Sequence, residues 1–226
     1  DWLQMVFFEE NEAVAHNNAV ESAITHARGL AKFGKAIEQV WLRTATIVED
    51  GEIRIYLDMC DPKWRQIEVS ASGVRVLDEP KVAMRRAPGM LALPEPAPKG
   101  QGDAALLKQV VNFSSDSDYR LIVAALLGVF RPFPQPVVSI NGPQGSGKSL
   151  GSEIIGQTID PNQQHVSGMP RSIEDLHVSA DNSRVLVIDN VSHLTEIVSD
   201  ELARVSTGAV FRRRAMYKGR KQENFY

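Results

Sequence analysis

The chain has 226 residues, of which 43% are hydrophobic and 23% charged, and its formal net charge is −3. This near-average composition excludes disordered, collagen-like and coiled-coil chains, and the single cysteine, Cys60, excludes an intrachain disulfide and favours a reducing compartment. The longest apolar run, residues 121–130, falls well short of the ~20 residues that a bilayer span needs, so we expect a cytoplasmic protein without a membrane segment.

Residues 1–93 predict a small α+β module. Apolar residues recur at helical spacing from Glu9 to Trp41, which predicts one or two helices with a break near Gly29 and Gly34. Turn residues such as Asp50-Gly51 then separate four short segments in which apolar residues alternate. These segments are 46–48, 53–57, 66–69 and 74–77. We therefore expect a helical segment followed by an antiparallel meander.

Residues 94–102 are rich in proline and glycine and predict a semi-rigid linker between two domains. Beyond the linker, Asp103 is a candidate N-cap of one helix, and Ser115 or Asp116 is a candidate N-cap of a second. The second helix is expected to stop before the proline-rich stretch 131–136, because proline disfavours helical backbone in the residue before it. The apolar run 137–140 then predicts a strand.

The segment 142–149, Gly-Pro-Gln-Gly-Ser-Gly-Lys-Ser, matches the pattern G-x-x-x-x-G-K-[ST] at every fixed position. Glycines let successive backbone N–H groups point at a phosphate, and the following helix adds its positive dipole end. Lys148 is expected to reach the β- and γ-phosphates of a nucleotide, and Ser149 is expected to bind Mg²⁺. The predicted nucleotide-binding residues are Gly142, Gln144, Gly145, Ser146, Gly147, Lys148, Ser149 and Leu150.

A second candidate element is the apolar run 185–188, which ends in Asp189. In phosphate-loop (P-loop) ATPases a carboxylate at this place holds Mg²⁺ together with the loop hydroxyl, so Asp189 is expected to join Ser149. The interval before it predicts a short strand near 165–167 and a helix over 171–180. This alternation predicts an α/β fold in which helices flank a parallel sheet.

Asn190 follows Asp189 at the position where many ATPases have glutamate. An amide orients a water molecule but takes up a proton poorly. We therefore predict Lys148, Asp189 and Asn190 as catalytic residues and leave the proton acceptor open among Glu196, Asp200 and Glu201.

The last sixteen residues carry six basic side chains and one acidic side chain, in contrast to the mildly acidic remainder. Two short segments flank Lys218-Gly219 and predict a hairpin. In a strand, Arg212 and Arg214 share one face, where two guanidinium groups can contact successive phosphates of a nucleic acid.

Three segments, 142–149, 185–194 and 202–218, together resemble the superfamily 3 helicase-like ATPases of phages, plasmids and integrated mobile elements. These ATPases belong to the AAA+ group and are similar to the poxvirus primase-helicase. The resemblance implies a P-loop NTPase domain over residues 103–226 that uses ATP and Mg²⁺ and assembles as a hexamer.

The resemblance also implies contact with single-stranded or forked DNA through a basic hairpin. The expected DNA-binding residues are Arg204, Arg212, Arg214, Lys218 and Arg220. Ala209 stands where the family has a second glycine, and the sequence ends at Tyr226, before the strand and the arginine finger that complete such a site in the family. We therefore expect slow ATP hydrolysis from these residues alone.

The expected function is binding and hydrolysis of Mg²⁺-ATP by a helicase-like ATPase that acts on DNA in mobile-element replication. Two alternatives stay open at this point. One is a P-loop kinase, which would be monomeric, active without DNA, and would transfer the γ-phosphoryl group to a small acceptor. The other is a non-catalytic nucleotide-binding regulator, which Asn190 in place of glutamate permits.

Overall fold

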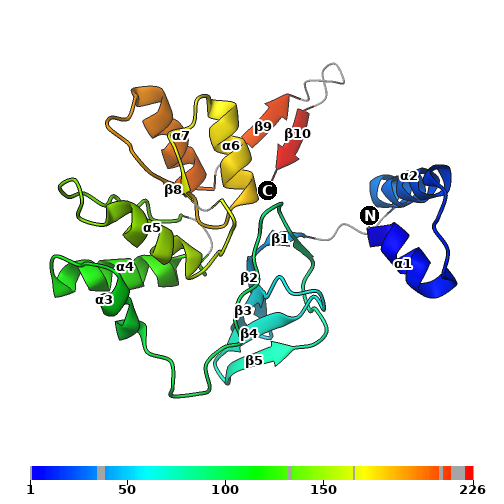
Figure 1. The fold of residues 1–226 in the computed structure, drawn as a ribbon, viewed down its shortest axis with the longest axis horizontal. Coiled ribbons are helices and arrows are strands. Elements are labelled where there is room, and N and C mark those ends of the chain that lie inside the picture. Colours follow the sequence, from blue (N-terminus) through cyan, green and yellow to red (C-terminus); the bar gives the residue numbers. More distant parts are fainter. Residues whose placement is uncertain are drawn as a thin grey trace. The chain divides into compact units, whose positions relative to one another are not determined.

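The computed structural model describes residues 2–34, 39–131, 134–164, 166–208, 211–214 and 222–225 (Figure 1). The chain separates into two compact units, Asp1–Gln39 and Val40–Tyr226. This division falls between the predicted helical segment and the meander, which the sequence had grouped together in residues 1–93. The proline-rich segment 94–102 lies within the second unit, so a domain boundary there stays a prediction.

The first unit consists of helices α1 (Trp2–Asn11) and α2 (Asn17–Phe33). The break between them begins at Glu12, whose φ is 52°, and not near Gly29, which lies inside α2. The expected break near Gly34 is confirmed as the end of α2, where the Gly34 N–H donates to the Leu30 carbonyl at 2.7 Å. None of the described side chains of α2 is buried.

The predicted meander is confirmed as a four-stranded antiparallel sheet in the order β2–β3–β4–β5. Asp50 and Gly51 make the first turn with φ values of 51° and 79°, as a tight hairpin turn requires. Two short strands beside this sheet, β1 and β6, pair in parallel. The bounds are β1 (Trp41–Leu42), β2 (Thr44–Glu49), β3 (Glu52–Asp58), β4 (Gln66–Ser70), β5 (Gly73–Leu77) and β6 (Met84–Arg85).

One face of the meander carries a small hydrophobic core. Leu57 and Ile67 lie directly opposite each other on β3 and β4 and are buried together with Met59. Leu93 and Phe130, both later in the chain, pack against this cluster. The core of the meander is therefore completed by residues from outside the sheet.

The region after the linker contains the predicted helices in the predicted order. Their side-chain caps include Ser115, whose hydroxyl accepts the Asp118 N–H at 3.1 Å, and Asp103, which accepts the Ala105 N–H at 2.8 Å. The elements are η1 (Ala104–Leu106), α3 (Leu107–Val110), α4 (Asp116–Gly128), α5 (Lys148–Gln157), β7 (Val166–Ser167), α6 (Ile173–Asn182), β8 (Val187–Ile188) and α7 (Glu196–Ser206).

The predicted parallel sheet is present only as the pair β7–β8 within the described residues. The strand expected over 137–140 is not formed there: the segment has no strand pairing, and the exposed fractions of Val137 and Val138 are 67% and 47%. A strand requires a hydrogen-bonded neighbour, and no described segment of the chain supplies one at this place. The P-loop NTPase fold class therefore stays a prediction.

The predicted C-terminal hairpin is confirmed in its two strands. β9 (Phe211–Arg214) and β10 (Gln222–Phe225) pair antiparallel, with Arg214 opposite Gln222 and Arg212 opposite Asn224. The turn around Lys218 and Arg220 lies outside the described residues. Among the described helices, none is both long and apolar enough to cross a membrane.

Candidate phosphate and magnesium site

The glycine-rich segment 142–149 forms an exposed loop that leads directly into α5. Gly147 is the N-cap of α5 and, like Gly145, has a left-handed backbone, with φ values of 81° and 79°. Residues with a Cβ rarely adopt this conformation, which explains the glycines at these two positions. The loop therefore ends at a helix N-terminus, where free N–H groups favour an anion.

Lys148 folds back over this loop. Its Nζ donates to the carbonyl oxygens of Gly142 at 2.7 Å and Pro143 at 2.6 Å. A Cβ at Gly142 would lie 3.0 Å from the Ser146 hydroxyl and 3.7 Å from Cδ of Lys148, so glycine leaves room for this arrangement. An ammonium group has three N–H donors, and the described contacts use two of them. The lysine thus brings a positive charge to the loop.

Asp189 directly follows β8 and lies beside the start of α5. The Ser149 hydroxyl lies close enough to this carboxylate to be the largest influence that lowers the pKa of Asp189. The backbone N–H of Asn190, 2.8 Å from Asp189 Oδ1, and the charge of Lys148 lower the pKa further. The carboxylate is therefore ionised at neutral pH.

The backbone fixes Asp189 at the edge of the parallel pair. Its N–H donates to the Ser167 carbonyl at 2.9 Å, which extends the β7–β8 pairing by one bond. Asp189 and Ser149 together present a carboxylate and a hydroxyl, the oxygen ligands that Mg²⁺ accepts. Among the described residues there is no group of three or more His, Cys, Asp or Glu side chains that could hold a metal ion, so phosphate and water oxygens would supply the remaining ligands.

The other residues predicted to bind the nucleotide lie next to Lys148, Ser149 and Asp189 in the chain. Gln144 and Leu150 are exposed, and Ser146 is half-buried with its N–H donating to Pro143 at 3.3 Å. Asn190 is exposed and has a φ of 61°, a left-handed conformation that asparagine tolerates better than most residues.

The three candidate proton acceptors differ in their surroundings. Glu196 and Asp200 are exposed on α7. Glu201 is half-buried, and its Oε2 lies 3.1 Å from Nε2 of His177 on α6. Its Oε1 lies 3.6 Å from Nε of Arg204. Glu201 is thus engaged in pairing α6 with α7.

The structure separates the predicted DNA-binding residues into two groups. Arg204 lies in the last turn of α7, and its side chain is 69% exposed. Arg212 and Arg214 occupy alternate positions of β9, opposite Asn224 and Gln222 of β10. Lys218 and Arg220 lie outside the described residues.

Sequence analysis missed a buried ion pair between Arg43 and Asp160, which lie 117 residues apart. Each looks like an ordinary surface charge in the sequence. The only local signal is the position of Arg43 between Leu42 and Thr44, inside a stretch of strand-forming residues.

A family model described as actinomycete integrative conjugative element replication protein matches residues 104–223, more than half of the chain. The match includes the glycine-rich loop, Asp189 and residues of both strands of the C-terminal hairpin. No curated protein and no solved structure matches the chain. The chain therefore belongs to the replication proteins of actinomycete integrative conjugative elements, which are mobile genetic elements.

Proposed function

We propose that this replication protein binds Mg²⁺-ATP at the loop 142–149 and hydrolyses it to act on DNA during replication of its mobile element. The observation that carries the proposal is that Ser149 and Asp189 lie together at the N-terminus of α5, beside Lys148, whose ammonium bonds the loop carbonyls. Two oxygen ligands for a hard cation thus lie at a helix N-terminus that attracts phosphate. Together they match the chemistry of a nucleoside triphosphate bound with magnesium.

Each residue has a separate role in this proposal. Backbone N–H groups of the loop and the start of α5 would bind the phosphates, and Lys148 would shift from the loop carbonyls toward the β- and γ-phosphates. Ser149 and Asp189 would hold Mg²⁺, which neutralises phosphate charge when bound. The side chain of Asn190 would orient a water molecule toward the γ-phosphate.

The wider fold and assembly are part of the same proposal. The order α5–β7–α6–β8, with β7 and β8 parallel, is compatible with a P-loop ATPase of the superfamily 3 type. We propose that the protein works as a hexamer and contacts single-stranded or forked DNA through Arg204, Arg212, Arg214, Lys218 and Arg220. The two arginines at alternate positions of β9 support this contact.

Calorimetry with ATP tests the nucleotide site. Lys148→Ala should weaken ATP binding about ten- to a hundredfold, because a charge-assisted hydrogen bond is worth ~1.5–3 kcal/mol. Asp189→Asn should remove most of the gain in affinity that Mg²⁺ provides and leave Mg²⁺-free binding largely intact. Gln157→Ala, at the far end of the same helix, is the matched control and should bind as the parent does. Equal ATP affinity in Lys148→Ala and the parent contradicts the proposal.

A salt titration of single-stranded DNA binding tests the hairpin. Each phosphate contact contributes ~0.7 to the slope of log affinity against log salt, so Arg212→Ala/Arg214→Ala should reduce the slope by about 1.4. The loss should be similar for all DNA sequences, because phosphate contacts carry no sequence information. Fluorescence anisotropy measures the slope, and Arg120→Ala on α4 is the control. Identical slopes in the double variant and the parent rule out DNA contact at these two arginines.

A nucleotide-dependent regulator without hydrolysis is a second candidate, favoured by Asn190. Its backbone N–H is bonded to Asp189, its side chain is exposed, and an amide is a poor proton acceptor. Release of phosphate from ATP, measured with and without single-stranded DNA, separates the two functions. ATP binding without DNA-stimulated release supports the regulator.

A further inference from the structure

A buried arginine connects the meander to the end of the phosphate-loop helix. Arg43 follows β1, has a φ of 59° and is completely buried. Its Nε donates to Oδ1 of Asp160 at 2.8 Å, and Asp160 is only 1% exposed. A left-handed backbone outside glycine persists only where its surroundings hold it, so tertiary contacts determine the conformation of Arg43.

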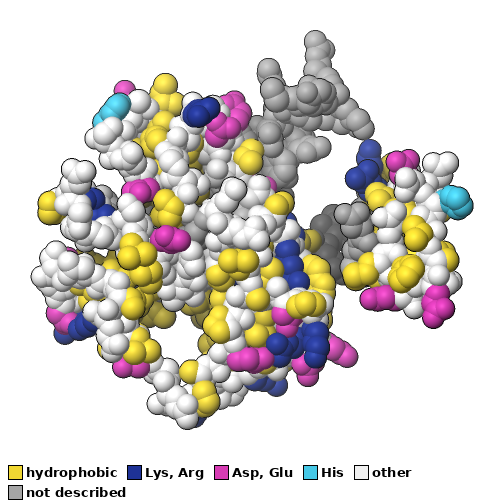
Figure 2. Space-filling model, in the orientation of Figure 1, with side chains coloured by type: hydrophobic (Ala, Val, Ile, Leu, Met, Phe, Trp, Pro, Cys, Tyr) yellow, Lys and Arg dark blue, Asp and Glu magenta, His cyan; other side chains and the backbone are white. Residues whose placement is uncertain are grey.

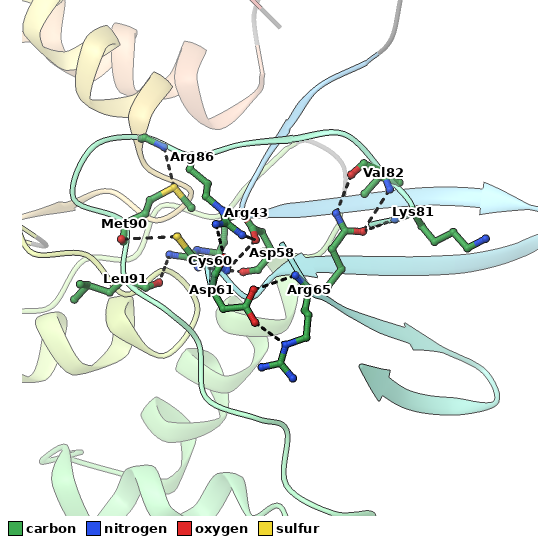
Figure 3. Close-up of polar contacts among 12 residues, drawn as sticks. Arg43, Asp58, Cys60, Asp61, Arg65, Lys81, Val82, Arg86, Met90 and Leu91 are labelled. Carbon is green, nitrogen blue, oxygen red and sulfur yellow. Dashed lines mark hydrogen bonds and ion pairs between the residues drawn. The ribbon is translucent and has the colours of Figure 1, made fainter. Parts of the chain in front are cut away.

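The rest of the guanidinium group binds three backbone carbonyls. Nη1 donates to Asp58 at 3.1 Å, and Nη2 donates to Leu91 at 2.9 Å and to Pro161 at 3.0 Å. Figure 3 shows Arg43 between Asp58 and Leu91. These bonds join the end of β3, the segment after the meander and the residues that follow α5. The planar guanidinium has the five donors in fixed directions that such a junction needs.

Asp160 continues the connection to β8. Its Oδ2 accepts the backbone N–H of Arg184 at 2.7 Å and that of Val185 at 3.4 Å. Asp160 comes three residues after the last residue of α5, and Val185 comes two residues before β8 begins. One carboxylate therefore holds the far end of α5 against the entry to β8, and Arg43 orients that carboxylate.

The near ends of the same two elements carry the candidate magnesium ligands. Ser149 lies in the first turn of α5, and Asp189 directly follows β8. The helix spans ten residues, or about 15 Å, between the junction and the loop. Since helices and strands move as stiff bodies, the junction at their far ends limits the separation of Ser149 and Asp189.

We propose that Arg43 and Asp160 are positioning residues that set the distance between Ser149 and Asp189, and with it the Mg²⁺ dependence of nucleotide binding. This inference rests on the proposed function, because it concerns the same site. Stability alone is a weak reason for such a pair, since well-packed apolar residues often stabilise a protein as much as a buried ion pair. The meander is thereby part of the frame of the nucleotide site.

The test measures ATP affinity in Mg²⁺ and in EDTA for the parent, Arg43→Met and Arg86→Met. Arg43→Met removes the arginine and keeps the Asp160 bonds to Arg184 and Val185. Arg86→Met is the matched control: Arg86 pairs with the buried Asp58 at 2.7 Å, and its described contacts all lie within residues 58–64. Both variants remove an arginine of the meander from an ion pair with a buried carboxylate, but only Arg43→Met breaks the contact with the segment between α5 and β8.

We expect Arg43→Met to reduce the Mg²⁺-dependent gain in affinity about two- to thirtyfold, because residues that contact no ligand change the coupling between two sites by about this much. The affinity for ATP without Mg²⁺ should not change. Arg86→Met should keep the full gain. If Arg43→Met does not fold, Arg43→Lys replaces it, because lysine keeps the charge but cannot make the four bonds, and the same loss is expected.

The outcomes distinguish this inference from the proposed function. A full Mg²⁺-dependent gain in the folded Arg43 variant, or an equal loss in Arg86→Met, overturns the positioning role and leaves the nucleotide site standing. A parent protein that shows no Mg²⁺-dependent ATP binding overturns both.

Discussion

The meander region, residues 41–93, and the phosphate-loop region, residues 134–208, differ in the number of charged side chains that they bury. The meander buries Arg43, Asp58 and Glu68, each at most 2% exposed and each held by an ion pair, whereas the phosphate-loop region buries the carboxylate of Asp160, which pairs with Arg43. The phosphate-loop region keeps its functional side chains at the ends of α5 and β8, where Gly147 and Asn190 mark sharp turns of the backbone.

The two regions are similar in their apolar side chains. Each buries a few, such as Leu57 in the meander and Leu176 in the phosphate-loop region, and each leaves large ones exposed, such as Ile53 at 63% and Leu150 at 60%. Figure 2 shows apolar side chains at the surface over α3 to α5, and basic beside acidic side chains over β3 to β5. The two regions therefore differ in the charges that they bury and not in the burial of their apolar side chains.

The largest expected effect on stability lies in the buried charges of the meander. The Asp58 carboxylate accepts from Nη2 of Arg86 at 2.7 Å and from the backbone N–H of Cys60 at 2.8 Å. Asp58→Ala removes both bonds. Breaking a buried pair costs about 3–5 kcal/mol, because the remaining charge is left uncompensated. Urea denaturation measures the loss, and Glu95→Ala, on an exposed side chain, is the control. A loss below ~1 kcal/mol would show that the buried charges are not what stabilises the meander.

A smaller effect is expected from a helix cap in the second unit. Ser115→Ala removes the acceptor of the Asp118 N–H at the start of α4 and should cost about 1 kcal/mol. Ser115→Thr keeps the hydroxyl and should recover most of that stability. Thermal unfolding of the three proteins checks this expectation. Equal losses in both variants would mean that the hydroxyl is not the cause.

The smallest expected effect is the pH dependence contributed by Glu68. The hydrogen bond from Arg75 is the main influence that lowers the pKa of Glu68 in the folded protein. A carboxyl with a lowered pKa stabilises the fold above its unfolded pKa of about 4.3, and this contribution is lost as the pH falls through the lower, folded value. Arg75 is 61% exposed, so solvent screens the pair and the effect is modest.

Acid unfolding followed by circular dichroism tests this dependence. Glu68→Gln should flatten the fall in stability below about pH 4.3. Glu79→Gln, at an exposed position, should behave like the parent. A Glu68→Gln protein whose stability falls as steeply as that of the parent would assign the acid sensitivity to other carboxylates.

Local patterns in the sequence predicted much of the fold and of the candidate site. Strict alternation and the Asp50-Gly51 turn predicted the meander, and the pair Ser115 and Asp116 predicted the start of α4, where Ser115 is the cap. The glycine spacing of 142–149 predicted a loop that opens a helix, and the run ending in Asp189 predicted a carboxylate beside Ser149. These features are encoded within a few residues of chain, where backbone sterics and capping hydrogen bonds act.

Tertiary structure alone decided which charges are buried and which apolar segments pair. The apolar run 137–140 has the composition of a strand but finds no pairing partner among the described residues, because a strand depends on a neighbour that its own sequence does not encode. Arg43 and Asp160 look like surface residues, yet they meet across 117 positions and are fully desolvated. A buried charge is stable only when its partner arrives from elsewhere in the chain, so its place is determined by packing and not by local pattern.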